Sequence, residues 1–352
     1  MSATPDPVAS PAARPPTLRD VAVLAGVSPM TVSRVFSGNL NVRPEVQERV
    51  RSAASTLGYR RNENARSLRP GHRSGLIGVT ITNIANPYYA EMQRGIEEVA
   101  AEHSRRILIG NSNEDAELES RLVADFLGRQ VEGLIVVPSG SAADSVHLRT
   151  AAQGGVPIAL ASRALDDLDV DTVLVDDIGG AFAATDRILA EGHTRVGFLG
   201  TQASVFTGRR RLQGFRDAHA VRGIAIDEDL VLAGQRDVQS AEAAMQALLQ
   251  LADPPTAVFT ANNRNTIGAI RAIELDRRRR RSAAPLRIRL IGFDSFEFAD
   301  LSPVPLSVVA HDARELGRRA ASMLLERIEG LDPAVAGRVI ELPARLQEVP
   351  AP

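Results

Sequence analysis

The stretch TLRDVAVLAGVSPMTVSRVF, residues 17–36, decides the fold of the first part of the chain. The letters TLRD form a start like a capping box for one helix, and Gly26 ends that helix. Ser28 is a good N-cap for a second helix, and Pro29 suits its first position because that residue needs no N–H. Two short helices joined by a tight turn that contains glycine predict a helix-turn-helix, whose second helix can enter a major groove.

The residues that follow complete a small basic head. A third helix is predicted from Pro44 to Gly58, because apolar side chains recur there at helical spacing. Residues 17–73 hold ten arginines against four acidic residues, whereas residues 74–352 hold 30 arginines against 38 acidic residues. A cationic head on an acidic body favours a polyanionic partner for the head.

These motifs resemble the head of the LacI/GalR family of bacterial transcription regulators. The resemblance implies a helix-turn-helix DNA-binding domain over residues 17–61, followed by a hinge helix and linker over residues 62–73. The stretches that carry it are TLRDVA (17–22), LAGVS (24–28), TVSRV (31–35), LGYR (57–60) and NENARSL (62–68).

The resemblance also implies which residues contact double-stranded operator DNA. Pro29, Met30 and Arg34 are expected nearest the base edges of the major groove. The hinge helix is too short to be stable alone, and on DNA we expect it to insert Leu68 as an apolar wedge in the minor groove. The alternative is a flexible linker whose leucine packs on the core. The predicted DNA-binding residues are Thr17, Leu18, Ser28, Pro29, Met30, Thr31, Ser33, Arg34, Asn41, Asn62, Ala65 and Leu68.

From Leu76 onward, short apolar strands alternate with amphipathic helices, a pattern typical of parallel α/β units. Such sheets bind ligands beyond the carboxyl ends of their strands. Polar residues directly after predicted strands are therefore candidate ligand contacts, although the same residue types also cap helices and turns. They are Asn83, Ser139, Ser162, Asp176, Gln202, Asn262 and Asp294.

The body is similar to the sensor core of the same family, which resembles a periplasmic sugar-binding protein. The similar stretches are NIANPYY (83–89), GHTRV (192–196), ANN (261–263) and GFD (292–294), together with Arg209 and Gly214-Phe215. The resemblance implies a two-lobed core over residues 74–352. One lobe is expected at about 74–175 plus 311–338, and the other at about 176–310 plus the end of the chain.

The same resemblance implies a site for a small-molecule effector between the lobes. Asn263 and Ser162 stand where the family commonly has aspartate. Because the site then carries less negative charge, it repels an anionic ligand less, and a sugar phosphate or a sugar acid can be the effector. An alternative is that Arg209 and Asp294 form a structural ion pair between the lobes. The implied effector-binding residues are Tyr88, Tyr89, Ser162, Arg209, Asn262 and Asp294.

The composition excludes several classes of enzyme. The chain has no cysteine, and all 41 of its basic residues are arginine. It therefore lacks thiolate nucleophiles, cysteine zinc sites, and the lysine of P-loops and Schiff-base enzymes. The histidines show no metal spacing, so we expect no metal and no cofactor. The run Arg277–Arg281 is interpreted as a solvated loop between a helix and a strand.

The amino terminus carries no export signal, and no apolar stretch is long enough for a membrane helix. Residues 1–16 are rich in proline and are predicted to be a disordered tail. These features predict a cytoplasmic protein without a membrane partner. Because the chain ends without leucine heptads, a homodimer is expected.

The sequence thus predicts an α/β protein: a two-lobed core like a periplasmic binding protein, with an N-terminal all-α helix-turn-helix DNA-binding head. The predicted function is a ligand-responsive transcriptional regulator, a repressor of carbohydrate uptake or utilisation genes. It would bind a pseudo-palindromic operator as a dimer and a sugar or sugar derivative as effector. The alternatives are a sugar-binding protein for transport, or a sugar-modifying enzyme with a DNA-binding appendage in which Asp176, Asp177 and Asp294 act as paired carboxylates.

Overall fold

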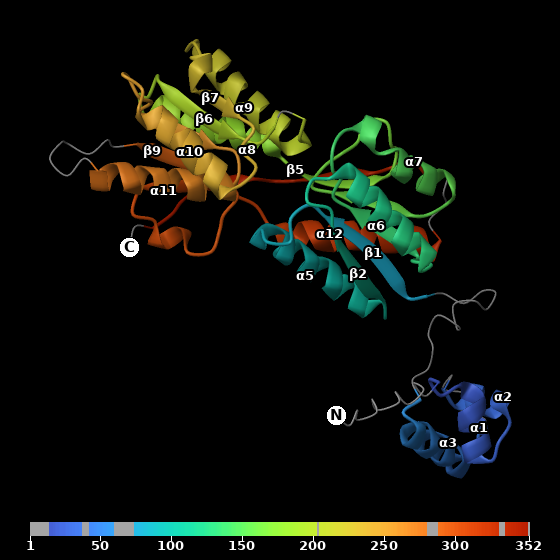
Figure 1. The fold of residues 1–352 in the computed structure, drawn as a ribbon. Helices are drawn as coiled ribbons and strands as arrows, with labels where there is room; N and C mark the ends of the chain where they lie inside the picture. Colours follow the sequence, from blue (N-terminus) through green and yellow to red (C-terminus); the bar gives the residue numbers. More distant parts are fainter. Residues whose placement is uncertain are drawn as a thin grey trace, which may run out of the picture. The chain divides into compact units, whose positions relative to one another are not determined.

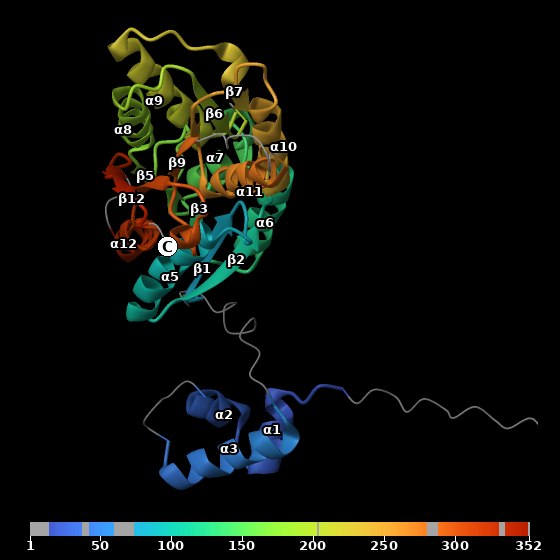
Figure 2. The same cartoon turned by 90° about the vertical axis from the view of Figure 1, so that its left-hand side faces the viewer.

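The computed structural model describes residues 14–36, 42–59, 74–202, 204–279, 288–330 and 335–350. The chain divides into two compact units, Met1–His72 and Arg73–Pro352, which Figures 1 and 2 show in two views. Most of the predicted tail and the whole predicted hinge helix lie outside the described residues. No helix in the described ranges is long and apolar enough to cross a membrane.

The first unit contains the predicted helix-turn-helix. Its described helices are α1 (Leu18–Ala25), α2 (Pro29–Phe36) and α3 (Pro44–Leu57). Helix α1 begins with a capping box, in which the Asp20 carboxylate accepts a hydrogen bond from the Thr17 N–H at 2.6 Å. It ends at Gly26, whose φ of 64° lies in the left-handed region that glycine adopts readily. Val21, Val32 and Val50, one from each helix, are fully buried and form the centre of a small core.

The second unit begins with a parallel sheet in the order β11-β5-β4-β3-β1-β2. Side chains alternate across this sheet: Ile135 belongs to the cluster that contains α5 and α12, whereas Leu134 and Val136 belong to the cluster that contains α6 and α7. Helices therefore cover both faces, as Figure 1 shows. The strands are β1 (Leu76–Ile81), β2 (Arg106–Asn111), β3 (Gly133–Val136), β4 (Ile158–Ala161), β5 (Asp171–Val175) and β11 (Val339–Leu342), and the helices are α5 (Pro87–Glu102), α6 (Ala116–Gly128), η1 (Ala142–Asp144), α7 (Val146–Gln153) and α12 (Ala313–Glu329).

The other lobe is built on a second sheet, in the order β12-β10-β9-β8-β6-β7. All its pairings are parallel except that of β10 with β12, which is antiparallel. The strands are β6 (Val196–Gly200), β7 (Val231–Ala233), β8 (Ala257–Thr260), β9 (Arg289–Phe293), β10 (Leu306–Ala310) and β12 (Arg345–Glu348). The helices are α8 (Asp177–Ala190), α9 (Phe206–Arg222), η2 (Glu228–Leu230), α10 (Val238–Leu249), α11 (Asn263–Arg279) and η3 (Ala299–Leu301).

Within the described ranges the chain passes between the lobes three times. It does so from β5 into α8, from β10 into α12, and from β11 into β12. The predicted end of the first lobe at residue 338 needs correction, because β11 continues the first sheet to Leu342 by pairing with β5. The three crossings bring residues from both lobes to one place, and the polar site described below lies there.

The arginine run also differs from its prediction as a loop. Arg277, Arg278 and Arg279 form the last turn of α11, and the rest of the run lies outside the described residues. Glu274, three and four positions earlier, pairs with Arg277 at 3.6 Å and Arg278 at 3.0 Å. Cations at a helix C-terminus also complement the helix dipole, so the helix continues further than its arginine-rich sequence suggested.

Candidate functional site

The outer face of α2 presents the side chains predicted to read DNA bases. Pro29, Met30 and Arg34 are exposed, and 65% of Met30 is accessible to solvent. Ser28 instead caps the helix, since its Oγ accepts a hydrogen bond from the Thr31 N–H at 3.1 Å. The exposed set therefore combines two apolar side chains and one guanidinium, a combination suited to thymine methyl groups and guanine edges.

The other predicted DNA contacts have mixed positions. The Thr17 hydroxyl donates to the Asp20 carboxylate at 2.7 Å, and Leu18 packs against the core of the head. Ser33 is half-buried on α2. Asn41, Asn62, Ala65 and Leu68 lie outside the described residues.

A buried charge cluster lies where the chain crosses between the lobes. Arg211, on α9, donates from Nε to Asp177 Oδ1 at 2.8 Å and from Nη1 to the Ala261 carbonyl at 2.6 Å. Its Nη1 and Nη2 also reach Asp294 at 3.2 and 3.5 Å. The guanidinium carbon lies 3.7 Å from the centre of the Phe293 ring. These hydrogen bonds use four of the five N–H groups of Arg211, so one donor remains for a ligand.

The two carboxylates that share Arg211 have different electrostatic environments. Burial raises the pKa of Asp177, and Arg211 offsets this only in part. Burial also acts to raise the pKa of Asp294, but Arg211 and His311 outweigh it and hold that pKa below its usual range. Asp294 is therefore a firm anion at neutral pH. Asp177 Oδ2 is buried and has no hydrogen-bond partner among the described residues.

Aromatic and hydroxyl groups of the first lobe adjoin this cluster. The Tyr88 hydroxyl donates to Ser162 Oγ at 3.1 Å, and the Tyr88 ring packs edge-on against the His311 ring with 5.5 Å between their centres. His311 Nε2 lies 2.9 Å from Asp294 Oδ1. Tyr88 of one lobe therefore contacts His311, which in turn contacts the charge cluster of the other lobe.

Backbone strain occurs at matching places in the two lobes. Ser162 directly follows β4 and has a φ of 66°, and Asp294 directly follows β9 and has a φ of 65°. Residues other than glycine rarely adopt this conformation, and where they do it often marks a functional site. In both lobes the strained residue directs a polar side chain toward the cluster.

A direct hydrogen bond also joins the lobes. Asn263 Nδ2, at the start of α11, donates to Asn86 Oδ1 at 2.8 Å. The same Asn86 oxygen caps α5 by accepting from the Tyr88 N–H at 3.2 Å. The Asn263 amide therefore ties the first turn of α11 to the helix that carries Tyr88.

The structure brings only some of the predicted effector residues together. Tyr88, Ser162 and Asp294 lie at the cluster, but Arg209 does not: it is exposed and lies 5.8 Å from the Phe206 ring centre. Arg211 makes the contact with Asp294 instead. Helical geometry turns Arg209 and Arg211, two residues apart, to different faces of α9, so Arg209 lies away from the cluster in this structure.

Two more predicted residues have structural partners. Tyr89 is buried in the first lobe, where its hydroxyl accepts from Thr82 Oγ1 at 2.7 Å. Asn262 Oδ1 caps α11 by accepting from the Asn265 N–H at 2.8 Å. Three carboxylates were considered for hydrolysis. One of them, Asp176, caps α8, because its Oδ1 accepts a hydrogen bond from the Gly179 N–H at 2.7 Å. Asp177 and Asp294 share one guanidinium, so the three are not arranged as an acid and base pair.

The sequence reading missed Arg211, Asp177 and His311. One available signal was the buried stripe of α9, in which Arg211 shares a face with Gly214, Phe215 and Ala218 at helical spacing. His311 directly follows a strand, as Asp294 does, but β10 was not predicted. No group of three or more potential metal ligands was found in the described part of the chain.

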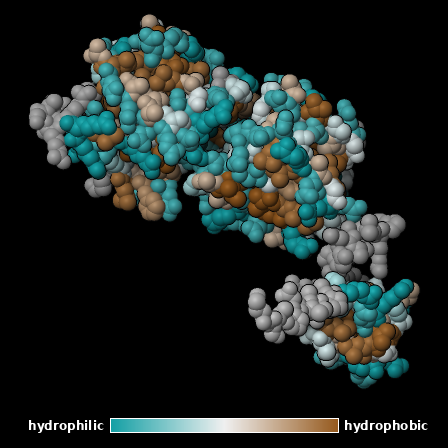
Figure 3. Space-filling model, viewed as in Figure 1, coloured by the Kyte–Doolittle hydropathy of each residue, from teal (hydrophilic) through white to brown (hydrophobic). Residues whose placement is uncertain are grey.

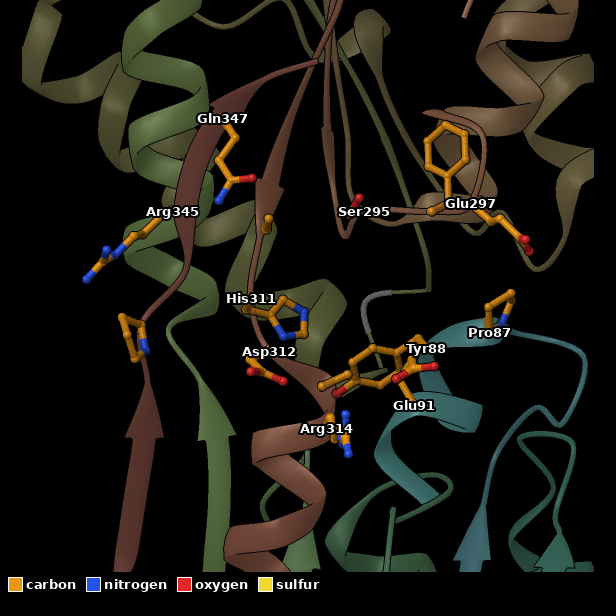
Figure 4. A pocket seen from close by; sticks show the side chains of 14 residues that line it. Pro87, Tyr88, Glu91, Ser295, Glu297, His311, Asp312, Arg314, Arg345 and Gln347 are labelled. Carbon is orange, nitrogen blue, oxygen red and sulfur yellow. The ribbon is translucent and has the colours of Figure 1, made fainter. Parts of the chain in front are cut away.

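A cavity of about 850 Å³ lies beside the cluster at the crossings (Figure 4). Tyr88 and His311 form part of its wall, whereas Ser162, Arg211, Asn262 and Asp294 do not line it. Its lining residues are Pro87, Tyr88, Glu91, Ser295, Phe296, Glu297, Ala310, His311, Asp312, Ala313, Arg314, Pro343, Arg345 and Gln347.

Comparison with known proteins agrees with this architecture. Residues 17–62 match the model of the bacterial regulatory proteins of the lacI family, and residues 74–347 match that of the periplasmic binding proteins and sugar-binding domain of the LacI family. Catabolite control protein A of Priestia megaterium is 29% identical over 332 residues, covering 94% of this chain and 97% of the relative. The transcriptional regulator GalS of Salmonella typhimurium is 31% identical over 314 residues, covering 89% and 90%.

Two solved structures are also similar along most of the chain. The lac repressor dimer bound to operator and the anti-inducer ONPF has a TM-score of 0.79 at 25% identity, covering 96% of this chain and 99% of that one. The transcriptional regulator CelR in complex with cellobiose has a TM-score of 0.69 at 28% identity, covering 95% and 99%.

A helix-turn-helix head joined to a two-lobed binding core defines a DNA-binding transcription regulator that responds to a small molecule. The chain belongs to the LacI family of bacterial regulatory proteins, which are transcription regulators and not enzymes.

Proposed function

We propose that this regulator is a homodimeric repressor of carbohydrate uptake or utilisation genes whose affinity for operator DNA changes when a sugar or sugar derivative binds between its lobes. The observation that carries the proposal is the Arg211–Asp294 cluster, which sits at the crossings and touches the first lobe through His311 and Tyr88. A ligand at this cluster would contact both lobes, so its affinity would depend on how the two lobes are arranged. Because the target is chromosomal DNA, we place the protein in the cytoplasm.

The effector site combines charged groups with a ring face. Arg211 offers a remaining N–H, ionised Asp294 is a strong acceptor, and Tyr88 with Ser162 supplies an apolar ring beside a hydroxyl. Such a set suits vicinal hydroxyl groups, whose C–H face can lie on an aromatic ring. The similar regulator CelR in complex with cellobiose supports a sugar. Asn263 and Ser162 carry no charge, so an anionic sugar derivative is also admissible.

The DNA contacts follow from α2 and the hinge segment. Pro29, Met30 and Arg34 read base edges, because they occupy the exposed face of α2. The family resemblance of the sequence supports the remaining predicted contacts of the head. It also supports the insertion of Leu68 as a wedge in the minor groove.

A homodimer is supported by exposed apolar side chains on the core. Ile84 is 64% and Ile109 45% accessible in the first lobe, and Phe298 is 65% and Leu301 62% accessible in the second. Figure 3 shows hydrophobic residues gathered over the face where α5 and β2 lie. A contiguous exposed apolar patch is typical of an association surface. The similar lac repressor structure is a dimer bound to operator.

The test begins with the full-length chain and a pool of random DNA duplexes, from which bound sequences are selected. We expect a two-fold symmetric sequence. A thermal-shift screen of sugars, polyols and sugar phosphates then identifies ligands, and fluorescence anisotropy measures operator affinity with each. An effector should change that affinity by about 5–150-fold. Selection of no sequence, or chemical turnover of the sugar, would contradict the proposal.

A further inference from the structure

The cavity beside the crossings has features of a second ligand site. Its volume of about 850 Å³ falls in the range that small molecules occupy in proteins. Of the residues to which we assign effector binding, Tyr88 lines the cavity, whereas Arg211 and Asp294 do not. A ligand in this cavity would therefore not be the effector held by Arg211.

His311 supplies to the wall of the cavity a buried nitrogen atom to which no described residue hydrogen-bonds. Its side chain is only 2% exposed, and Nδ1 has no hydrogen-bond partner among the described residues. Its other nitrogen, Nε2, faces Asp294 Oδ1 at 2.9 Å. Because an ionised carboxylate only accepts hydrogen bonds, Nε2 carries a proton toward Asp294, and Nδ1 is the ring nitrogen left without a partner within the described ranges. A buried polar atom without a partner is costly, so a ligand hydroxyl group, which can donate or accept, gains free energy by hydrogen-bonding to Nδ1.

The rest of the lining indicates the chemistry of that ligand. Glu297 and Arg345 have no ion pair in the part of the chain that the structure describes, and Gln347 offers both a donor and an acceptor. In Figure 4, Gln347 and Glu297 lie on opposite sides of His311 and Tyr88, and the Arg345 guanidinium is directed away from them. Phe296 adds a second aromatic ring to Tyr88. Donors and acceptors of both signs around ring faces match a molecule with many hydroxyl groups and no net charge.

We propose that this cavity is a second binding site, distinct from the effector site, for an uncharged polyhydroxylated small molecule that hydrogen-bonds to His311 Nδ1. Since His311 also holds Asp294, which pairs with Arg211, occupancy of the cavity acts directly on the effector cluster. The inference does not depend on which DNA sequence the regulator binds.

The absence of cysteine allows a sharp test. The Gln347→Cys variant of the full chain carries a single thiol at the rim of the cavity. The variant is equilibrated under mild reductant with the disulfide of 1-thio-β-D-glucose, so that its thiol can exchange into a mixed disulfide with thioglucose. A parallel reaction uses the disulfide of ethanethiol. Mass spectrometry measures the fraction of protein modified in each reaction, and the ratio of the two fractions is the thioglucose ratio. The control is Gln250→Cys, which replaces an exposed glutamine outside the cavity. We expect the thioglucose ratio to be at least about ten times higher at position 347, which corresponds to about 1.4 kcal/mol.

Two further variants assign the capture to the lining groups. In the Gln347→Cys background, His311→Gln keeps a donor for Asp294 and removes the ring nitrogen Nδ1. The substitution Glu297→Gln removes an exposed carboxylate without disturbing the core. Each should lower the thioglucose ratio toward the control value, with melting temperature measured to confirm folding. Equal ratios at positions 347 and 250 would overturn the site. Stronger capture of 3-mercaptopropionate or of cysteamine than of thioglucose would overturn the uncharged ligand class.

Discussion

At the scale of single residues, the exposed face of α2 determines how the head reads DNA. Arg34 is exposed there, and an arginine that pairs with both guanine acceptors contributes about 1–3 kcal/mol of discrimination between bases. We expect Arg34→Ala to weaken binding to the selected operator by about 5–150-fold while leaving binding to random DNA nearly unchanged. Fluorescence anisotropy at one fixed salt concentration measures both affinities.

A substitution at a phosphate contact is the appropriate contrast. Such a change weakens binding to operator and to random DNA alike, because phosphates carry no sequence information. Equal losses on the two DNAs for Arg34→Ala would therefore place Arg34 among the backbone contacts.

The sequence identified the type of site better than its individual members. Three consecutive arginines begin at Arg209, and the family resemblance selected the first of them, Arg209. The periodicity of buried positions in α9 would have selected Arg211. For Asn262, the sequence allowed a helix cap or a ligand contact, and only coordinates show that its oxygen caps α11.

At the scale of elements, Asp171 fixes the end of α12 to the edge of the first sheet. Its buried carboxylate accepts from Arg327, on α12, and from Arg338, just before β11, with shortest distances of 2.8 Å to each. Asp171→Asn removes a charge that two guanidinium groups share. We expect it to cost about 3 kcal/mol, the lower end for a broken buried pair because Arg338 is partly exposed. Urea unfolding of the core measures this loss at pH 7.

The same carboxylate predicts a dependence of stability on pH. Burial acts to raise the pKa of Asp171, but Arg327 and Arg338 outweigh it and hold the pKa far below its usual range. A carboxyl whose pKa is lower in the folded state contributes fully above its unfolded pKa of about 3.9, and that contribution is lost as pH falls further. The free energy of unfolding of the wild type should therefore fall more steeply below about pH 4 than that of Asp171→Asn. Parallel pH profiles for the two proteins would refute this assignment.

Close packing of α5 on α12 positions Tyr88 beside His311. A Cβ added at Gly317 would lie 2.0 Å from the Met92 carbonyl oxygen, so Gly317→Ala must push the two helices apart. We expect the free energy of unfolding to fall by about 1–3 kcal/mol. Gly128→Ala is the matched control, because a Cβ there meets nothing within 4 Å. If Gly317→Ala unfolded at the same urea concentration as Gly128→Ala, the close approach of these helices would be wrong.

Elements with strong periodicity were predictable, and short strands near the crossings were not. The sequence predicted the alternation of apolar strands and amphipathic helices, but β10 was missed although LSVVA is apolar and buried. Strands β11 and β12 were missed because VIEL and RLQE are four-residue edge strands that contain charged residues. Their pairing depends on sheet neighbours far away in sequence, which local patterns do not contain.

At the scale of the whole molecule, the three crossings provide short connections about which the two lobes of the core could close. Closure of two lobes about short connections is a common way to convert ligand binding into a change of shape. A ligand changes DNA affinity only through its different affinity for the two lobe arrangements, typically about 1–3 kcal/mol. The core places Arg211, Asp177 and Asp294 on one lobe and Tyr88 on the other, with His311 at the crossing between them.

The division into a head and a two-lobed core was predictable from sequence, because charge and periodicity both change near residue 74. The proposed position of the effector site between the lobes follows from the family resemblance. The hydrogen bond between Asn263 and Asn86 was not predictable, since it joins residues 177 positions apart in the sequence.

The measurement that tests the central claim most directly is the effector-induced change in operator affinity for wild type, Arg211→Lys and Arg209→Lys. Lysine keeps the positive charge beside Asp177 and Asp294 but loses the planar fork of donors. We predict that all three proteins bind operator alike without effector. Wild type and Arg209→Lys should then change affinity by the same factor when effector is added, whereas Arg211→Lys should not respond. A normal response in Arg211→Lys, or its loss in Arg209→Lys, would contradict the assignment of the effector site to the Arg211–Asp294 cluster.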